Sequence, residues 1–197
     1  MSETDSPAEP AEGFGVSCAV PPPPVACALP GAAASVDRTW QGPGAQERHE
    51  ILRRTRSIAI VGASDNPARA SYFVATYLRS SAPYDVYYVN PRVERVLGQP
   101  AYRSLADLPV VPDLVDVFRR HEDLPAVADE AIAAGAQTLW LQLGLWHEGA
   151  ARTAQAAGLS VVMDRCVKIE HARFHGGLRL AGFDTGVISS KRQLLGR

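Results

Sequence analysis

The sequence predicts an α/β fold, in which a doubly wound, mainly parallel sheet of five strands is covered by helices on both faces. Short apolar runs, often rich in β-branched residues, recur along the chain and end at glycine or polar residues. Segments with apolar residues at helical spacing lie between most of these runs. Apolar runs of this kind indicate strands buried on both faces, and parallel neighbours need crossover helices between them.

The first strand is expected at 57–62, a β-branched apolar run that ends in glycine and is predicted to be central. The apolar pair Ile51 and Leu52 sits among charges just before it, which predicts a short amphipathic helix at 46–55. After the break at Asn66-Pro67, apolar residues recur at helical spacing and predict a helix at 71–79.

The rest of the chain repeats this alternation. Further strands are expected at 85–89, 114–118, 138–142 and 159–163. Helices are expected at 124–134 and 148–157, and they stop at Gly135 and Gly158.

The N-terminal part of the chain has a different composition. Of the first 50 residues, 22 are Pro, Gly or Ala, and seven are acidic against two basic. We therefore expect 1–45 to be a disordered Pro/Ala-rich arm, 46–170 to be the folded domain and 171–197 to be a C-terminal extension. Without the first 50 residues the chain holds 14 acidic and 18 basic side chains, and this mildly basic balance suits a phosphorylated ligand.

Composition excludes several classes of function. No apolar run approaches the roughly 20 residues that cross a bilayer, so no membrane contact is expected. Acidic residues occupy the N-terminal region where a secretory signal would need Lys or Arg, so a cytoplasmic location with reduced thiols is expected. The folded part has no block of Lys and Arg longer than a pair, so nucleic-acid binding is not expected. The chain has no Cys-x-x-Cys pair, so a zinc site is not expected either.

In doubly wound sheets the ligand lies beyond the carboxyl ends of the strands. The loop that follows the first strand begins at Gly62 and Ala63 and opens a helix, an arrangement that favours anion binding by backbone N–H groups. Ser64 and Asn66 add side-chain donors. A P-loop is excluded because no Gly-Lys-Ser/Thr follows, and the dinucleotide fingerprint is broken because Ser64 and Pro67 replace its later glycines. The alternative interpretation of this loop is a plain capped turn.

The end of the second strand discriminates between cofactors. NAD-binding folds place Asp or Glu there, whereas this chain has Asn90-Pro91-Arg92. An arginine at this place favours an extra phosphate, which NADP carries at the ribose 2′ position and coenzyme A (CoA) at the 3′ position. Arg69, Arg119 and Arg120 add to the same electropositive rim.

Five blocks of sequence together resemble one family. They are 61–67 (VGASDNP), 89–91 (VNP), 116–119 (DVFR), 139–144 (LWLQLG) and 161–166 (VVMDRC). In this order and spacing they resemble the stand-alone CoA-binding proteins of bacteria, which are similar to the CoA-binding N-terminal domain of the succinyl-CoA synthetase alpha subunit. The resemblance runs from about residue 51 to residue 170.

The resemblance implies a Rossmann-like domain that binds CoA across the strand ends. By similarity, the phosphates lie on the loop formed by Gly62, Ala63, Ser64, Asp65 and Asn66, and the phosphoadenosine end meets Asn90, Pro91 and Arg92. Arg92 stands where the synthetase has lysine, which keeps the charge but changes its geometry from a point charge to a fork. Phe118, Arg119 and Arg120 border the nucleotide, and Gln142, Leu143 and Gly144 line the path of the pantetheine arm.

The resemblance implies a non-catalytic binding or regulatory module for CoA or acyl-CoA. The matched region contains neither the phosphohistidine domain nor the ATP-grasp chain of the synthetase, and no catalytic residue or metal site is predicted. His147 is interpreted as a solvated side chain. Two alternatives remain: an NADP-dependent oxidoreductase, and the CoA-binding subunit of an acyl-CoA ligase with its catalytic parts on another chain.

Two features near the C-terminus have more than one interpretation. Cys166 ends the fifth strand at the ligand edge, where Arg165 would favour the thiolate and a reversible mixed disulfide with CoA. The alternative is a small buried residue that closes the strand. The segment 171–197 keeps many apolar residues, so we expect it to pack on the domain, to form a homodimer contact or to dock on a metabolic enzyme.

Overall fold

The computed structural model describes residues 39–175, and our expectations for 1–38 and 176–197 lie outside the described residues. In chain order the elements are α1 (Ala45–Arg54), β1 (Ser57–Val61), α2 (Ala70–Ser81), β2 (Asp85–Val89), β3 (Arg95–Val96), β4 (Gln99–Tyr102), β5 (Leu114–Val117), α3 (Leu124–Ala133), β6 (Thr138–Leu141), α4 (Glu148–Ala156), β7 (Ser160–Val162) and α5 (Val167–His175). Short 3₁₀ turns, η1 (Leu105–Asp107) and η2 (His121–Asp123), precede β5 and α3. The predicted α/β class and the expected helices and strands are confirmed, with ends that differ by a few residues at most.

The strands form one sheet in the order β3-β4-β2-β1-β5-β6-β7, with β1 in its interior as predicted. Every described pair is parallel except β3 with β4. The expected number of five strands was wrong, because β3 and β4 form a hairpin that we did not predict. β3 has only two residues and β4 contains Pro100, so neither carries the apolar pattern of a buried strand.

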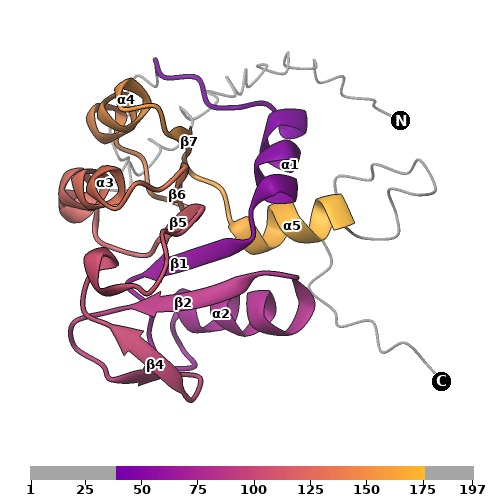
Figure 1. Cartoon of the computed structure of the whole chain (residues 1–197). Coiled ribbons are helices and arrows are strands. Elements are labelled where there is room, and N and C mark those ends of the chain that lie inside the picture. The colour runs from indigo at the N-terminus through magenta and orange to yellow at the C-terminus, as the bar shows by residue number, and fades with distance from the viewer. Residues whose placement is uncertain (1–38, 176–197) are drawn as a thin grey trace, which may run out of the picture. The chain divides into compact units, whose positions relative to one another are not determined.

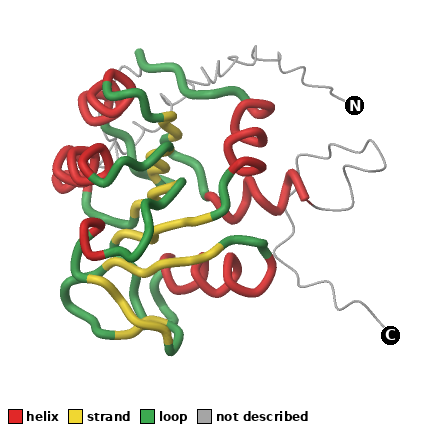
Figure 2. Tube along the Cα trace, viewed as in Figure 1, coloured by secondary structure: helices red, strands yellow, loops and turns green. Residues whose placement is uncertain are grey.

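Helices cover both faces of the sheet. Figure 1 shows α3 and α4 on one face and α1, α2 and α5 on the other, and Figure 2 shows the strands between these two helical layers. Alternate residues of β1 enter the two cores: Ala59 and Val61 pack on the side of α3 and α4, and Ile58 and Ile60 on the other side. Because both faces of β1 are buried, its sequence is apolar at successive positions.

The segment just before α1 packs against α4. Trp40 is buried, its indole N–H donates to Gln155 Oε1 at 2.8 Å, and its ring lies edge-on to Trp146. Thr39 donates its hydroxyl to Glu148 at 2.7 Å, and this bond, with two backbone N–H donors, lowers the pKa of Glu148 to about 2. Thr39 and Trp40 belong to the expected N-terminal arm, but Trp40 is buried against the domain, and the exposed Thr39 is hydrogen-bonded to Glu148.

Helix α5 packs against both α1 and α2. It crosses the expected domain boundary after residue 170, and its Glu170 is buried and accepts from Arg48 Nε at 2.9 Å. The next residue, His171, is also buried. Its Nδ1 lies 3.0 Å from the Tyr77 hydroxyl, and its ring stacks on His175 at 4.1 Å between centroids.

His171 makes the stability of the fold depend on pH. Burial lowers the pKa of His171 to about 4, whereas an unfolded histidine titrates near 6.5. The unfolded chain therefore binds this proton first as the pH falls, so the free energy of unfolding decreases between about pH 6.5 and pH 4. We expect a loss of about 2 to 3 kcal/mol between pH 7.5 and 4.5 from this residue.

The measurement is urea unfolding at the two pH values, with His171→Gln as the variant. His171→Gln should lower stability at pH 7.5 and reduce the loss on acidification. His121→Gln, which changes an exposed histidine before α3, should leave that loss unchanged. An equal pH dependence in His171→Gln and the unaltered protein would contradict this role.

Candidate functional site

The strand order places a switch point at the carboxyl end of β1. The chain proceeds from β1 to β2 on one side and later returns to β5 on the other side, so the connections leave β1 in opposite directions. In open α/β sheets the ligand site lies at this point. The loops that follow β1, β2, β5, β6 and β7 all lie at this edge because these strands are parallel.

The loop after β1 is fixed between its two neighbours. Gly62 has a φ of +86°, and its N–H donates to Val89 O of β2 at 2.9 Å. On the other side, Phe118 N donates to Val61 O at 2.8 Å. A Cβ atom at Gly62 would lie 2.4 Å from Phe118 O, so only glycine allows the β1 and β5 ends to approach this closely.

Asn90 joins the β1 loop to the β2 loop. Its Nδ2 donates to Ala63 O at 2.6 Å, and its Oδ1 accepts from Arg92 N at 2.9 Å. Its backbone N–H donates to Tyr102 O of β4 at 2.8 Å. The asparagine of the Asn-Pro pair therefore fixes two loops relative to each other.

The polar side chains of the β1 loop also hold backbone. Ser64 Oγ accepts from Asn66 N at 3.2 Å, and Asn66 Oδ1 accepts from Ala68 N at 2.9 Å. Asp65 Oδ1 accepts from Leu97 N at the tip of the β3–β4 hairpin, at 2.8 Å. Helix α2 then begins after Arg69 without a side-chain cap, and the Arg69 carbonyl accepts from Tyr72 N at 3.1 Å.

Arginines stand around this loop. Arg69 and Arg92 are exposed and Arg119 is half-buried. Within residues 39–175 none of these three forms an ion pair. Arg120, which we also expected in this set, pairs instead with Glu122 at 2.7 Å and with Asp123 at 3.4 Å. Of the four arginines expected at this edge, Arg69, Arg92 and Arg119 are therefore the ones without an ion pair in the described residues.

A buried polar pair lies at the ends of β5 and β6. Gln142 is buried, and its Nε2 donates to Asp116 Oδ1 at 2.6 Å. Asp116 is fully buried, and its Oδ2 has no hydrogen-bond partner in the described part of the chain. Burial raises the pKa of Asp116 to about 8. Our site prediction omitted Asp116, although a carboxylate within the apolar run 114–118 was a visible signal.

The loop after β6 also contains Leu143 and Gly144, which are both exposed at the edge. Gly144 has a φ of +80°, and its N–H donates to Asp164 Oδ1 of the β7 loop at 2.8 Å. In the same loop, His147 is half-buried rather than solvated, and its Nδ1 accepts from Ala150 N at 3.0 Å as the N-cap of α4.

Cys166 stands at the start of α5. Burial raises the pKa of its half-buried thiol, although the backbone N–H groups of Ile169 and Lys168 act in the opposite direction. The charges that act on it are those of Asp116, which raises the pKa, and Lys168, which lowers it. Our expectation that Arg165 favours the thiolate was wrong, because Arg165 is exposed and does not act on the sulfur, and burial dominates.

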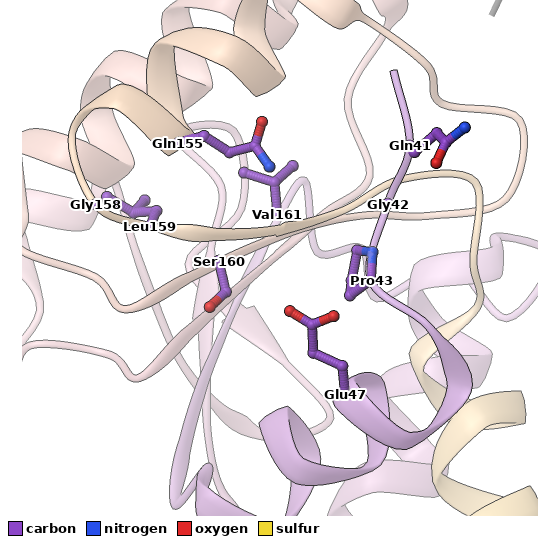
Figure 3. A pocket seen from close by; sticks show the side chains of 9 residues that line it. All are labelled: Gln41, Gly42, Pro43, Glu47, Gln155, Gly158, Leu159, Ser160 and Val161. Atoms are coloured by element: carbon purple, nitrogen blue, oxygen red, sulfur yellow. The ribbon is translucent and has the colours of Figure 1, made fainter. Parts of the chain in front are cut away.

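Two hollows in the described surface lie at the opposite edge, and one of them is lined by Arg54 and residues 157–160. The other, of about 370 Å³, is formed by residues 41–43, Glu47 and the start of β7 (Figure 3). No Lys or Arg lines it, and Glu47 faces it, so it does not suit a phosphorylated ligand. The electrostatics and the strand order therefore favour the carboxyl edge as the site.

The described residues contain neither a metal-binding cluster nor a membrane-spanning helix. No group of three or more His, Cys, Asp or Glu side chains within 39–175 is arranged to hold a metal ion. No helix of that range is long and apolar enough to cross a membrane.

Comparison with protein families identifies this arrangement. Residues 56–172 match the model of a CoA binding domain. The chain belongs to the CoA-binding domain family. The match covers every strand and the switch point, and it agrees with the resemblance read from the five sequence blocks.

Relatives of known sequence support the assignment. The chain is 41% identical over 132 residues to an uncharacterized protein of Bacillus subtilis, YneT, and the match covers 67% of this chain and 97% of that protein. It is also 41% identical over 59 residues to the alpha subunit of an ADP-forming acetate–CoA ligase of Pyrococcus furiosus. That second match spans 30% of this chain and 13% of the subunit.

Solved structures show the same fold. A hypothetical protein from Pyrococcus horikoshii superimposes with a TM-score of 0.66 at 38% identity, over 68% of this chain and 94% of that one. A Thermus thermophilus protein superimposes with a TM-score of 0.63 at 36% identity, over 67% and 99% of the two chains. Both neighbours are small proteins that correspond almost entirely to the described domain.

Gly62→Ala tests the close approach at the switch point. The new methyl group would meet Phe118 O and force an unfavourable φ, so we expect a loss of about 2 to 4 kcal/mol in the free energy of unfolding. Gly144→Ala is the matched control, since it has a similar φ but open space around the Cβ position. It should cost about 1 to 2 kcal/mol. The measurement is urea unfolding. Equal losses of unfolding free energy in the two variants would show that the contact with Phe118 O adds no destabilisation.

Proposed function

We propose that the chain binds CoA or acyl-CoA at the carboxyl edge of the sheet and acts as a non-catalytic binding or regulatory module. The observation that carries the proposal is the β1 loop. It is fixed by Val89, Phe118 and Asn90, it opens an uncapped helix, and it lies beside three arginines that pair with no carboxylate in the described domain. Membership of the CoA-binding domain family supports CoA as the ligand.

The diphosphate of CoA would lie against the β1 loop and the start of α2. Ser64 Oγ and Asn66 Oδ1 accept from the N–H groups of Asn66 and Ala68, so the Ser64 hydroxyl and the Asn66 Nδ2 group would still be able to donate to a phosphate. The dipole of the 12-residue α2 favours negative charge at its start. In this proposal the three polar residues shape the loop, and Arg69 adds a charge at its end.

The phosphoadenosine end would lie across the Asn90-Pro91-Arg92 turn. Asn90 fixes the backbone of Arg92, which leaves the exposed guanidinium to form a bidentate contact with the 3′-phosphate. Phe118 and Arg119, at the end of β5, would border the nucleotide on the other side of the β1 loop. Arg120 contributes less because Glu122 and Asp123 already pair with it.

The pantetheine arm would run along the loops that follow β6 and β7. Leu143 is 57% exposed and offers apolar surface for the arm, and Gly144 leaves its path open because nothing lies within 4 Å of its Cβ position. Gln142 is buried beneath this path. The end of the arm would come to Cys166.

A role as the CoA-binding subunit of an acyl-CoA ligase is the second candidate, and the similarity to the acetate–CoA ligase alpha subunit favours it. In that case a partner chain would supply the catalytic groups. A pull-down with the chain as bait, followed by an acyl-CoA synthesis assay on the captured fraction with ATP or ADP, distinguishes the two roles. Acyl-CoA synthesis by the captured fraction would favour the ligase.

Isothermal calorimetry with CoA, acetyl-CoA, NADP, NAD and ATP tests the ligand. The proposal expects saturable one-to-one binding of CoA or acetyl-CoA and much weaker binding of the other three. Binding of NADP without CoA would replace the proposal by the oxidoreductase alternative.

Arg92→Ala tests the placement of the 3′-phosphate. Loss of a charged hydrogen-bond partner costs about 1.5 to 3 kcal/mol, so we expect CoA affinity to fall roughly ten- to a hundredfold. Affinity for dephospho-CoA, which lacks this phosphate, should change less than threefold. Arg152→Ala is the control, because that exposed arginine of α4 pairs with Glu148 and makes none of the proposed CoA contacts. Equal losses for both ligands would place the 3′-phosphate elsewhere.

A further inference from the structure

A buried carboxyl near the carboxyl edge of the sheet has no role in phosphate or nucleotide binding. Asp116 is the third residue of β5, and its neighbours across the sheet are Ile60 of β1 and Trp140 of β6. Both neighbours are apolar, and Asp116 has no exposed surface. Its Oδ2 has no hydrogen-bond partner among the described residues. A buried carboxyl oxygen without a partner is rare in folded proteins and calls for an explanation.

The other oxygen of Asp116 fixes the carboxamide of Gln142. Gln142 directly follows β6 at the carboxyl edge, and its Nε2 donates to Asp116 Oδ1 at 2.6 Å. A carboxylate accepts hydrogen bonds and donates none, so it selects the nitrogen of the carboxamide and leaves the oxygen for another partner. Gln142 Oε1 forms no hydrogen bond within residues 39–175, and 4% of the residue is still exposed. An N–H group that arrives at this edge would find a preoriented acceptor.

The protonation state of Asp116 decides whether the Gln142 oxygen is available. A protonated carboxyl has an O–H to donate, and it can pair with a carboxamide through both of its oxygens, so its O–H competes for the amide oxygen. Burial raises the pKa of Asp116 to about 8, and the bond from Gln142 opposes this effect only in part. Near neutral pH the free protein therefore holds Asp116 mostly protonated.

We propose that Gln142, oriented by Asp116, accepts a hydrogen bond from an amide N–H of the pantetheine arm, and that the arm binds to the ionised form of Asp116. The pantetheine arm carries amide groups, which the phosphates and the adenosine of CoA lack. A chain of bonds from the ligand N–H to Gln142 and on to Asp116 polarises both groups, which strengthens each bond. Asp116 is thus a positioning residue that acts through Gln142. The proposal rests on CoA binding at this edge.

The titratable group on which Asp116 acts is the thiol of Cys166, just before α5. The charge of Asp116 raises the pKa of this thiol, and the charge of Lys168, on α5, lowers it. Burial raises the thiol pKa most, so the thiol stays mostly protonated up to pH 9. The buried side chains of α2, which covers the same face of the sheet, do not titrate. A change of affinity between pH 7 and pH 9 is therefore assigned to Asp116.

Calorimetry of the full chain with acetyl-CoA tests the proposal, because the thioester, unlike the thiol of CoA, does not titrate. If the arm binds only the ionised form of Asp116, the affinity follows the ionised fraction, and the dissociation constant should be about tenfold smaller at pH 9 than at pH 7. At pH 8 binding should release about half a proton, measured in buffers of different ionisation enthalpy.

The matched ligand is adenosine 3′-phosphate 5′-diphosphate, which has the adenosine and phosphates of CoA without the arm. Its affinity should change less than about twofold between pH 7 and pH 9. A change of less than about twofold for acetyl-CoA, or an equal change for both ligands, would overturn the proposal.

Two variants locate the effect. Asparagine has a donor and an acceptor, as the protonated carboxyl has, so Asp116→Asn should bind acetyl-CoA equally at both pH values and about tenfold more weakly than the unaltered protein at pH 9. Gln142→Leu should also lose the pH dependence. Asp129→Asn, which changes an exposed carboxyl of α3, and Cys166→Ser should both retain it. A pH dependence that persists in Asp116→Asn would reject this carboxyl as its source.

Failure of this proposal and failure of CoA binding give different results. Acetyl-CoA that binds equally at pH 7 and pH 9 would overturn the role of Asp116 and leave CoA binding in place. No binding of acetyl-CoA at either pH would overturn both. If Asp116→Asn and Gln142→Leu do not fold, the comparison of acetyl-CoA with the ligand that lacks the arm, made on the unaltered protein, decides by itself.

Discussion

The fold of the candidate site depends on the close approach of three strand ends around Gly62. The Gly62 N–H donates to Val89 O, and the Phe118 carbonyl lies where the Cβ atom of a larger residue at position 62 would be. Asn90, which follows β2, donates to Ala63 O of the same loop. Because these contacts are made by backbone atoms or by one amide, the loop keeps its conformation without a ligand. A preformed loop of this kind avoids part of the ordering cost of binding.

Most of the fold could be predicted from the sequence because buried parallel strands have a strong pattern. The runs at 57–62, 114–118 and 138–142 are apolar at nearly every position, and each became a strand within one or two residues of the expected ends. The β3–β4 hairpin could not be predicted in this way, because it is short, largely exposed and interrupted by Pro100. Its tip, Leu97-Gly98, has two positive φ values, and leucine gives no signal for that conformation.

The places of the motif residues in the fold were predicted more accurately than the contacts of their side chains. The motif residues Ser64, Asp65, Asn66 and Asn90 do stand at the carboxyl edge, but their side chains bind the protein's own backbone. Sequence gives the type and order of polar residues, whereas their partners depend on the distances between loops. The same limit applies to Cys166: an adjacent arginine in the sequence indicates an activated thiol, and burial reverses that effect.

The bond from Asp65 to Leu97 joins the phosphate-side loop to the tip of the hairpin, and Arg79 Nη1 also donates to the Leu97 carbonyl at 2.5 Å. The hairpin is thus held at one strained residue by two elements that flank the switch point. The β3–β4 edge of the sheet carries no part of the switch point, but one carboxylate joins it directly to the loop there.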